Sequence, residues 1–136
     1  LAARANAVAN GLSNVAFVCA DARDHLEQAR NVDMIILDPP KLAAQADHAS
    51  RARRYYRHII GAAMRALRRP GMLMLFSCSA ALGAAHLRDI VRDTAAEEQC
   101  AVRILKELHA GPDHPTLPAF PEGDYLAGLL LAVVAF

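Results

Sequence analysis

Strand-like and helix-like patterns of apolar residues alternate along most of the chain. Near-continuous apolar runs at 32–38 (VDMIILD) and 71–79 (GMLMLFSCS) predict strands of the kind that is buried on both faces of a parallel sheet. Further strands are expected at 15–21 (VAFVCAD), 101–108 (AVRILKEL) and 125–136 (YLAGLLLAVVAF). Strand and helix in alternation predict an α/β fold with a doubly wound sheet.

Helices are expected between these strands. Residues 1–10 are rich in alanine, and a brief helix is expected at 24–29. A longer helical pattern covers 50–69 and ends at a Pro-Gly pair, and another covers 84–98. The segment 109–124 contains four prolines and no helical period. The last two strands should therefore form an antiparallel hairpin.

The expected helix at 50–69 has two contrasting faces. At 100° per residue, one arc collects Tyr55, Ile59, Ile60, Ala63, Met64 and Leu67, and the opposite arc collects Arg51, Arg54, His58, Arg65 and Arg69. Seven of the 13 arginines lie in this stretch, with no acid among them. The basic face has two open interpretations, a solvated surface or a surface for RNA phosphates. Tyr55 is expected in the core.

Composition and charge indicate one soluble globular domain. The chain has 136 residues, 54% of them hydrophobic and 21% charged, with a net charge of +1. Its three cysteines are an odd number without CxxC spacing, which favours neither disulfides nor zinc and fits a reducing cytoplasm. Cys19 and Cys100 are expected to be packing residues. The longest apolar run, at 126–136, is too short to span a bilayer, so no membrane association is expected.

Three expected strands end on polar groups that could serve chemistry, namely Asp21, Asp38 and Cys78. In open α/β sheets, ligands bind beyond the carboxyl ends of the strands. Asp21 has an alternative role as the N-cap of the following helix. Asp38 is followed by two prolines, which restrict the backbone and remove two donors, so it is held rigidly.

Cys78 has two open interpretations. A free cysteine is often a small buried hydrophobic residue. It can also be a nucleophile, and a thiol beside the start of a helix would have a lowered pKa.

Taken together, NAVANGL, DPPK, PGMLMLFSCS and DHPTLPAFPEGDYLAGLLL resemble S-adenosylmethionine-dependent methyltransferases that modify carbon 5 of cytosine in bacterial large-subunit ribosomal RNA. The resemblance covers nearly the whole chain. It implies a Rossmann-like class I methyltransferase sheet, truncated at its N-terminus and ending in an antiparallel hairpin. It also implies that residues 1–136 are the C-terminal portion of a catalytic domain, without the RNA-binding domain and the glycine-rich cofactor turn that precede it in the family.

The resemblance also implies roles for individual residues. Asp21, with the backbone of Ala22, would contact the adenine of S-adenosylmethionine, and Asp38 would lie where the methyl donor and the target base meet. Cys78 would attack the pyrimidine. Substrate contacts are expected from Pro39, Pro40 and Lys41 and from Arg54 and Arg65 of the basic face. No metal is expected, a homodimer is left open, and the base that removes the carbon-5 proton is not identified, with Asp38 and a bound water as candidates.

Two rival functions remain open at this stage. The first is a uracil carbon-5 RNA methyltransferase. This chain resembles such enzymes in its Asp-Pro-Pro and in the Ser-Cys at a strand end, although Ser79 and the DHP segment favour cytosine. The second is a non-catalytic fragment that binds RNA. Amino-group methyltransferases usually carry an aromatic residue where this chain has Lys41. The cytosine family commonly has an aromatic residue after DPPK, where this chain has Leu42.

Overall fold

Four α-helices and four strands make up the part of the chain that the computed structural model describes, residues 2–41, 49–79 and 82–136. In chain order, the elements are α1 (Ala2–Ala9), α2 (Ala22–Gln28), β1 (Val32–Leu37), α3 (Ala49–Ala66), β2 (Leu67–Ser77), α4 (Ala84–Glu97), β3 (Ala101–Leu108), a 3-10 turn η2 (Pro121–Gly123) and β4 (Ala127–Val134). Residue 42, on which one expectation fell, lies outside the described residues.

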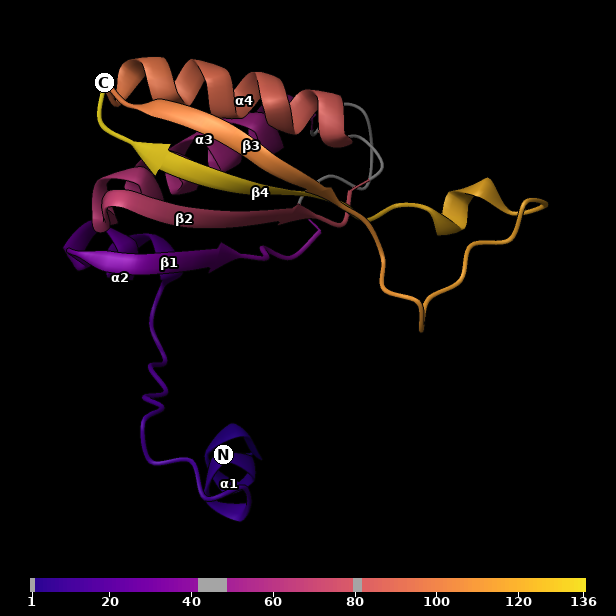
Figure 1. Cartoon of the computed structure of the whole chain (residues 1–136). Coiled ribbons are helices and arrows are strands. Elements are labelled where there is room, and N and C mark those ends of the chain that lie inside the picture. Colours follow the sequence, from indigo (N-terminus) through magenta and orange to yellow (C-terminus); the bar gives the residue numbers. More distant parts are fainter. Residues whose placement is uncertain (1, 42–48, 80–81) are drawn as a thin grey trace.

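The four strands form a single mixed sheet in the order β1-β2-β4-β3 (Figure 1). β1 and β2 are parallel and are joined through α3, while β4 pairs antiparallel with both β2 and β3. The expected antiparallel hairpin of the last two strands is therefore confirmed. Because β1 and β2 are parallel neighbours, the residues that follow them emerge at the same edge of the sheet.

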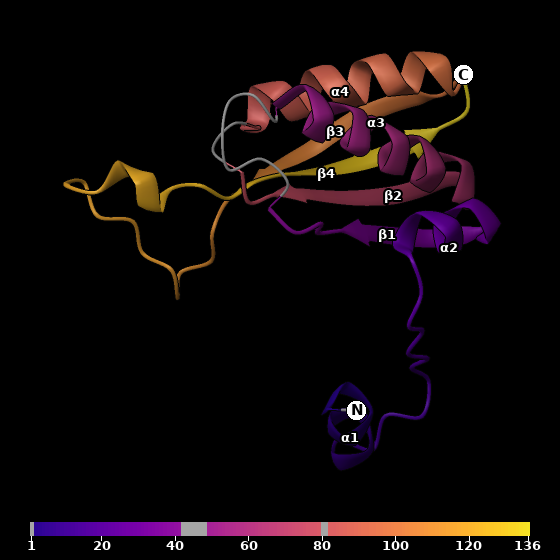
Figure 2. The ribbon, with the colours of Figure 1, turned by 180° about the vertical axis from the view of Figure 1, so that it is seen from behind.

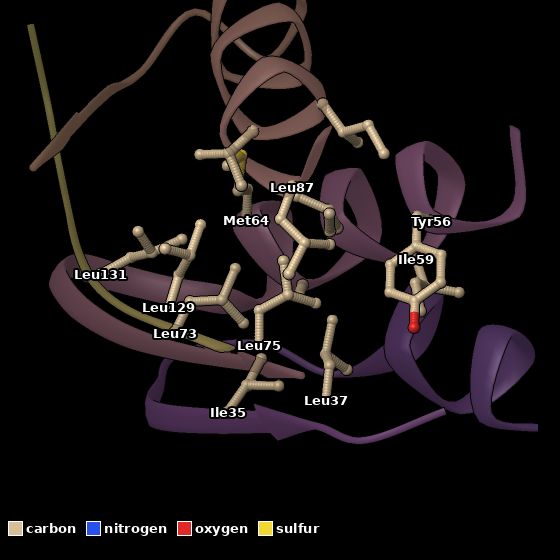
Figure 3. Close-up of a cluster of buried hydrophobic side chains, with 14 of the residues drawn as sticks. Ile35, Leu37, Tyr56, Ile59, Met64, Leu73, Leu75, Leu87, Leu129 and Leu131 are labelled. Atoms are coloured by element: carbon tan, nitrogen blue, oxygen red, sulfur yellow. The ribbon is translucent and has the colours of Figure 1, made fainter. Parts of the chain in front are cut away.

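Helices α2, α3 and α4 lie side by side over one face of the sheet (Figure 2). The core lies between this helical layer and the sheet (Figure 3). Alternate residues of three strands point into it, because successive side chains of a strand face opposite sides. They are Ile35, Leu37, Leu73, Leu75, Leu129, Leu131 and Val133. Each fully buried leucine contributes about 1.5–3 kcal/mol, so this layer holds the strand ends in place.

The opposite face of the sheet is apolar but is not covered by helices in the described part of the chain. Ile36 is 60% exposed and Met34 is 39% exposed, whereas their neighbour Ile35 is buried. The expectation that strand 32–38 is buried on both faces is therefore wrong for this structure. A continuous apolar run shows that both faces can be buried, and does not show which elements are present to bury them.

The expected strand at 15–21 does not form. Residues 12–21 have no regular secondary structure and lead away from the sheet to α1, which stands apart from it (Figure 1). A strand needs a neighbour to satisfy its backbone groups, and β1 pairs only with β2 within the described sheet. The helix expected at 50–69 also ends earlier, at Ala66, because Leu67 already pairs with Val32 of β1.

Candidate active site

Asp38 and Cys78 meet at the carboxyl edge of the two parallel strands. Asp38 follows Leu37, the last residue of β1, and Cys78 follows Ser77, the last residue of β2. The Cys78 Sγ atom lies 3.9 Å from Asp38 Oδ1, within reach of a weak thiol hydrogen bond. Two side chains that are 40 residues apart in the sequence are thus brought into contact by the pairing of their strands.

The surroundings of Cys78 raise the pKa of its thiol. Burial is the largest cause, and the negative charge and hydrogen bond of Asp38 add to it. The lowered pKa that a helix start would give is therefore not found, because α4 begins only at Ala84 and the nearest charge is an acid. A nucleophilic Cys78 would have to lose its proton as it reacts.

A pocket of about 280 Å³, called the Cys78 pocket below, opens beside these two residues. The ends of β1 and β2 form one wall, and the connection between β3 and β4 forms the other. It is lined by Asp38, Phe76, Cys78, Ala110, Gly111, His114, Gly123, Tyr125 and Leu126. His114 and Tyr125 were not assigned roles from the sequence, where His114 was noted only as part of the DHP segment. A proline-rich loop has no period that would indicate where its side chains fold back.

A second pocket of about 270 Å³, called the Ala22 pocket below, lies on the other side of Asp38. It is lined by Ala22, Leu26, Ile36, Leu37, Asp38, Pro39, Pro40, Tyr55 and Ile59. Asp38 is the one residue that lines both pockets. The structure thus brings Ala22 and Asp38 together. Pro39 and Pro40, which were predicted to contact the substrate, line this pocket and not the Cys78 pocket, and Lys41 is exposed beside them.

Asp21 is the N-cap of α2, directly before Ala22. Its carboxylate accepts a hydrogen bond from the Arg23 backbone N–H at 2.9 Å and two from the Arg23 guanidinium at 3.0 and 2.7 Å. These bonds hold the pKa of Asp21 well below its usual range. The capping role is thereby confirmed. The backbone N–H of Asp24 also contributes to this lowering, so the carboxylate is already well supplied with donors.

These residues fit an adenosine-type cofactor in part. The Ala22 pocket supplies an apolar slot of the kind that an adenine ring needs, whereas the Asp21 carboxylate beside it is already bonded to Arg23. In the described residues, no group of three or more His, Cys, Asp or Glu side chains could hold a metal ion.

A buried hydroxyl of α3 supports the strand that carries Cys78. Tyr56 is 1% exposed, and its hydroxyl donates to the carbonyl of Phe76 at 3.1 Å. Burial raises the pKa of Tyr56, so the hydroxyl keeps its proton and stays a donor. The backbone N–H of Ser79 donates to Ser77 Oγ at 3.3 Å on the far side of Cys78. The fully buried tyrosine is thus Tyr56 rather than Tyr55, which packs only partly against the core.

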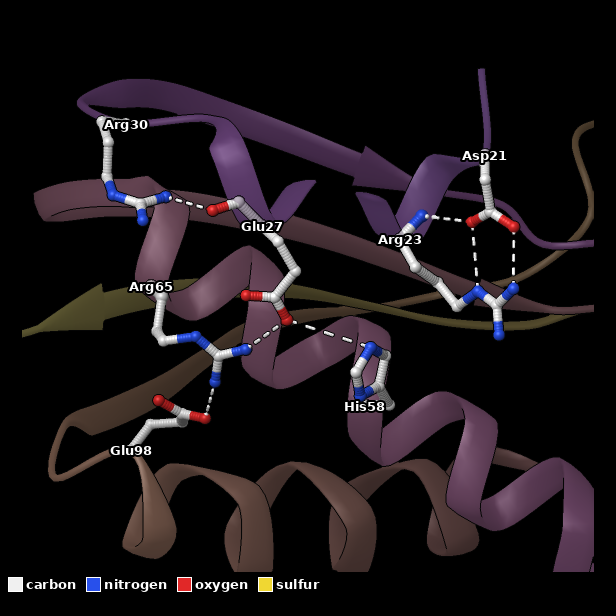
Figure 4. A network of polar contacts seen from close by, with 7 residues as sticks. All are labelled: Asp21, Arg23, Glu27, Arg30, His58, Arg65 and Glu98. Carbon is white, nitrogen blue, oxygen red and sulfur yellow. Dashed lines mark hydrogen bonds and ion pairs between the residues drawn. The ribbon is translucent and has the colours of Figure 1, made fainter. Parts of the chain in front are cut away.

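Two residues of the basic face of α3, His58 and Arg65, contact acids from neighbouring elements (Figure 4). Arg65 bonds Glu27 of α2 at 2.7 Å and also contacts Glu98, which follows α4. Other basic residues nearby also pair with acids: Arg53 with Asp89 and Arg57 with Glu97, and in β2 Arg68 with Asp33. Sequence inspection of this helix alone could not show these acids, because they come from other elements.

Arg54 and Arg65 differ in position as well as in pairing. Arg54 lies in the half of α3 that starts near the carboxyl edge of the sheet, and Arg65 lies in the last turn. Eleven residues of helix place them roughly 16 Å apart along the axis. Among the described residues, no ion pair to Arg54 is found. Both arginines nevertheless line one pocket of about 400 Å³ between α3 and the end of α4, together with Glu97 and Glu98.

The remaining cysteines differ from each other. Cys100 is buried, which confirms it as a packing residue, whereas Cys19 is exposed, so the same expectation is wrong for it. Cys19 lies in the segment that was expected to be a strand, and without that strand it has no layer to pack in.

None of the helices in the described residues is long and apolar enough to cross a membrane.

The fold places the chain structurally among class I methyltransferases. It matches a solved structure of a proposed methyltransferase complexed with SAH with a TM-score of 0.77 and 18% identity, over 95% of this chain and 35% of that one. A proposed SAM-dependent methyltransferase from Streptococcus mutans matches with a TM-score of 0.75 and 17% identity, over 95% of this chain and 34% of that one. The α/β class I sheet expected from the sequence is therefore confirmed.

The sequence is similar to particular ribosomal RNA enzymes. It is 36% identical over 137 residues to ribosomal RNA large subunit methyltransferase I of Shewanella denitrificans, covering 96% of this chain and 34% of that protein. The protein of the same name from Shewanella frigidimarina is 35% identical over the same shares. The chain thus spans about a third of the length of the relatives it matches. No protein-family model matches it.

Proposed function

We propose that the full-length protein is an S-adenosylmethionine-dependent methyltransferase that modifies carbon 5 of a cytosine in large-subunit ribosomal RNA. The contact of Cys78 with Asp38, between two pockets at the carboxyl edge of the sheet, carries this proposal. The similarity to large-subunit ribosomal RNA methyltransferases supports the substrate class.

Cys78 is the nucleophile in this proposal. Carbon 5 of cytosine is a poor nucleophile within an aromatic ring. A thiolate that adds to carbon 6 breaks the aromaticity and makes carbon 5 resemble an enamine carbon. Because the pKa of the thiol is raised, Cys78 rests as the thiol and must give up its proton during the attack.

Asp38 accepts that proton and then stabilises the adduct. Its carboxylate is the acceptor nearest to the thiol, at 3.9 Å. Once protonated, the carboxyl can donate to ring nitrogen 3, where electron density accumulates as the sulfur–carbon 6 bond forms. Pro39 and Pro40 restrict the backbone on which this carboxyl is held.

The cofactor is assigned to the Ala22 pocket, with Asp21 and Ala22 beside its adenine and Asp38 at its reactive end. When bound there, S-adenosylmethionine supplies an electrophilic methyl group. The protein's part is to hold the cytosine in the Cys78 pocket, on the opposite side of Asp38. A base must leave its stack to reach such a pocket.

The RNA-binding surface is proposed to include Lys41 and Arg54. Lys41 is exposed directly after the two prolines, and Arg54 lies toward the same edge of the sheet. Arg65 remains a predicted contact, although two acids already partner its guanidinium.

The proposal is tested by identifying the methylated nucleoside. Unmodified large-subunit ribosomal RNA is incubated with S-adenosylmethionine and the full-length protein, digested, and examined by mass spectrometry. We expect 5-methylcytidine from the wild type and from Cys19→Ala, whose exposed cysteine lines neither pocket, and none from Cys78→Ala. Formation of 5-methyluridine, of an N-methylated base, or of 5-methylcytidine by Cys78→Ala would refute it.

A further inference from the structure

We propose that His114 is the general base that removes the proton from carbon 5 after methyl transfer. This inference rests on the function proposed above. His114 lines the Cys78 pocket together with Asp38 and Cys78, although it comes from the connection between β3 and β4. The structure therefore adds the titratable groups of His114 and Tyr125 to a pocket for which the sequence suggested only Asp38 and Cys78.

The local backbone and a neighbouring acid place the imidazole. The His114 backbone N–H donates to the carbonyl of Gly111 at 2.9 Å, which closes a tight turn. The Asp113 carboxylate lies 3.6 Å from Nδ1 of His114. In the proposed step, the proton is accepted by Nε2, the ring nitrogen that lies away from Asp113.

The facial arrangement of the reaction requires a base in this pocket. The sulfur of Cys78 occupies one face of the cytosine ring, so the methyl group must arrive on the other. The hydrogen of carbon 5 is then left on the face of the sulfur. The Ala22 pocket lies on the donor side of Asp38 and the Cys78 pocket lies on the sulfur side, so the base must be in the Cys78 pocket.

Four titratable side chains line the Cys78 pocket, and three are unsuited to this step. Cys78 is bonded to carbon 6, and Asp38 has passed the thiol proton to ring nitrogen 3 and stays hydrogen-bonded there, away from carbon 5. A tyrosine hydroxyl such as that of Tyr125 is a hydrogen-bond donor rather than a base at neutral pH. Imidazole exchanges protons in this range, which leaves His114.

The step is balanced within the site. Nε2 of His114 takes the proton from carbon 5, and the electrons of that carbon–hydrogen bond form the double bond between carbons 5 and 6. The carbon 6–sulfur bond breaks, and Cys78 leaves as a thiolate. The proton that Asp38 gave to the ring nitrogen returns to Asp38 and then to the thiolate, and the imidazolium of His114 loses its proton to solvent.

Exchange of the carbon-5 hydrogen without cofactor tests this assignment directly. RNA labelled with tritium at cytosine carbon 5 is incubated with the full-length protein, and release of tritium to water is measured. General bases contribute typically 10²–10⁴-fold, so we expect release by His114→Gln to fall about 100-fold or more. His109→Gln, a histidine of the same connection outside the Cys78 pocket, should behave as the wild type.

Chemical rescue separates catalysis from structure. Imidazole added to His114→Gly should restore tritium release, which it would not do if the histidine only held the loop. In the presence of S-adenosylmethionine and ordinary RNA, His114→Gln should also accumulate a covalent methylated adduct on a denaturing gel.

A 5-fluorocytosine RNA distinguishes failure of this assignment from failure of the proposed function. Its adduct forms before proton removal, so wild type and His114→Gln should both give it. Wild-type tritium release by His114→Gln, or loss of the fluorocytosine adduct in this variant, would overturn the role of His114. Absence of the adduct from the wild type would instead refute the nucleophile, and the assignment of His114 would fall with it.

Discussion

The two pockets that share Asp38 have nearly equal volumes, about 280 and 270 Å³, but different chemistry. The Ala22 pocket is built from β1 and the helices α2 and α3, and its lining is mostly aliphatic. The Cys78 pocket takes its thiol from the end of β2 and its imidazole and phenol from the connection before β4. The Ala22 pocket suits a flat apolar ligand group, and the Cys78 pocket suits proton transfer and covalent chemistry.

The parallel strands β1 and β2 can thus divide a reaction between the Ala22 pocket and the Cys78 pocket. Asp38 stands at the junction because β1 ends one residue before it, and the prolines after it prevent the chain from continuing into the sheet edge. Cofactor and base would then approach from opposite sides of one carboxylate.

Filling the Ala22 pocket should weaken cofactor binding without affecting the thiol. Ala22→Leu adds three carbons at an exposed first-turn position, where the helix itself tolerates them. Overpacking costs about 1–3 kcal/mol, which corresponds to roughly 5- to 150-fold in affinity for S-adenosylmethionine. Calorimetry on the full-length protein measures this, with Ala5→Leu in α1 as the control. Equal affinities for both variants would remove the cofactor from this pocket.

Replacing the shared carboxylate should make the thiol more acidic. The pKa of Cys78 is raised by burial and by Asp38, so Asp38→Asn removes the second cause and the pKa should fall. Below the original pKa, more thiolate is then present, and alkylation by iodoacetamide should be faster. The rate is followed against pH in a Cys19→Ala background, with Asp124→Asn as the control.

The same Asp38→Asn variant should transfer methyl groups more slowly despite its more reactive thiol, because the proton acceptor and the ring-nitrogen contact are lost. An unchanged pH profile of alkylation would show that Asp38 does not interact with Cys78 in solution.

Two arginines of α3 should differ in their effect on RNA binding. Arg54→Ala should reduce the slope of log affinity against log salt by about one phosphate contact. Arg65→Ala should change this slope less, because Glu27 and Glu98 already neutralise its charge. It should instead lower the free energy of unfolding by up to about 1 kcal/mol. RNA titrations at several salt concentrations and urea unfolding measure the two effects, and equal slopes for both variants would contradict this account.

The sequence predicted that Asp38 and Cys78 each end a strand, and the parallel pairing of those strands brings the two side chains into contact. Apolar runs that end on Asp38 and Cys78 suffice to place both side chains at one edge, provided that the strands are parallel neighbours, and they are. The order β1-β2-β4-β3 could not be read in this way, because the last strand inserts between two earlier ones.

The errors also have physical causes. A strand at 15–21 requires a partner that hydrophobic pattern cannot reveal. The choice of Tyr55 over Tyr56 depended on the phase of a helix, and adjacent residues differ by only 100°. The acids opposite the basic face, and His114 beside Cys78, come from distant segments and became visible only once the chain was folded.

The most direct test is to find which atom of the protein bonds to the RNA. The full-length protein is incubated with S-adenosylmethionine and RNA containing 5-fluorocytosine, which cannot lose its carbon-5 substituent as a proton. The product is digested with protease and nuclease and sequenced by mass spectrometry. We predict a nucleotide attached to the peptide that contains Cys78, and no covalent product from Cys78→Ala. Attachment at Cys19 or Cys100, or an adduct that persists in Cys78→Ala, would contradict the assignment of Cys78 as the nucleophile.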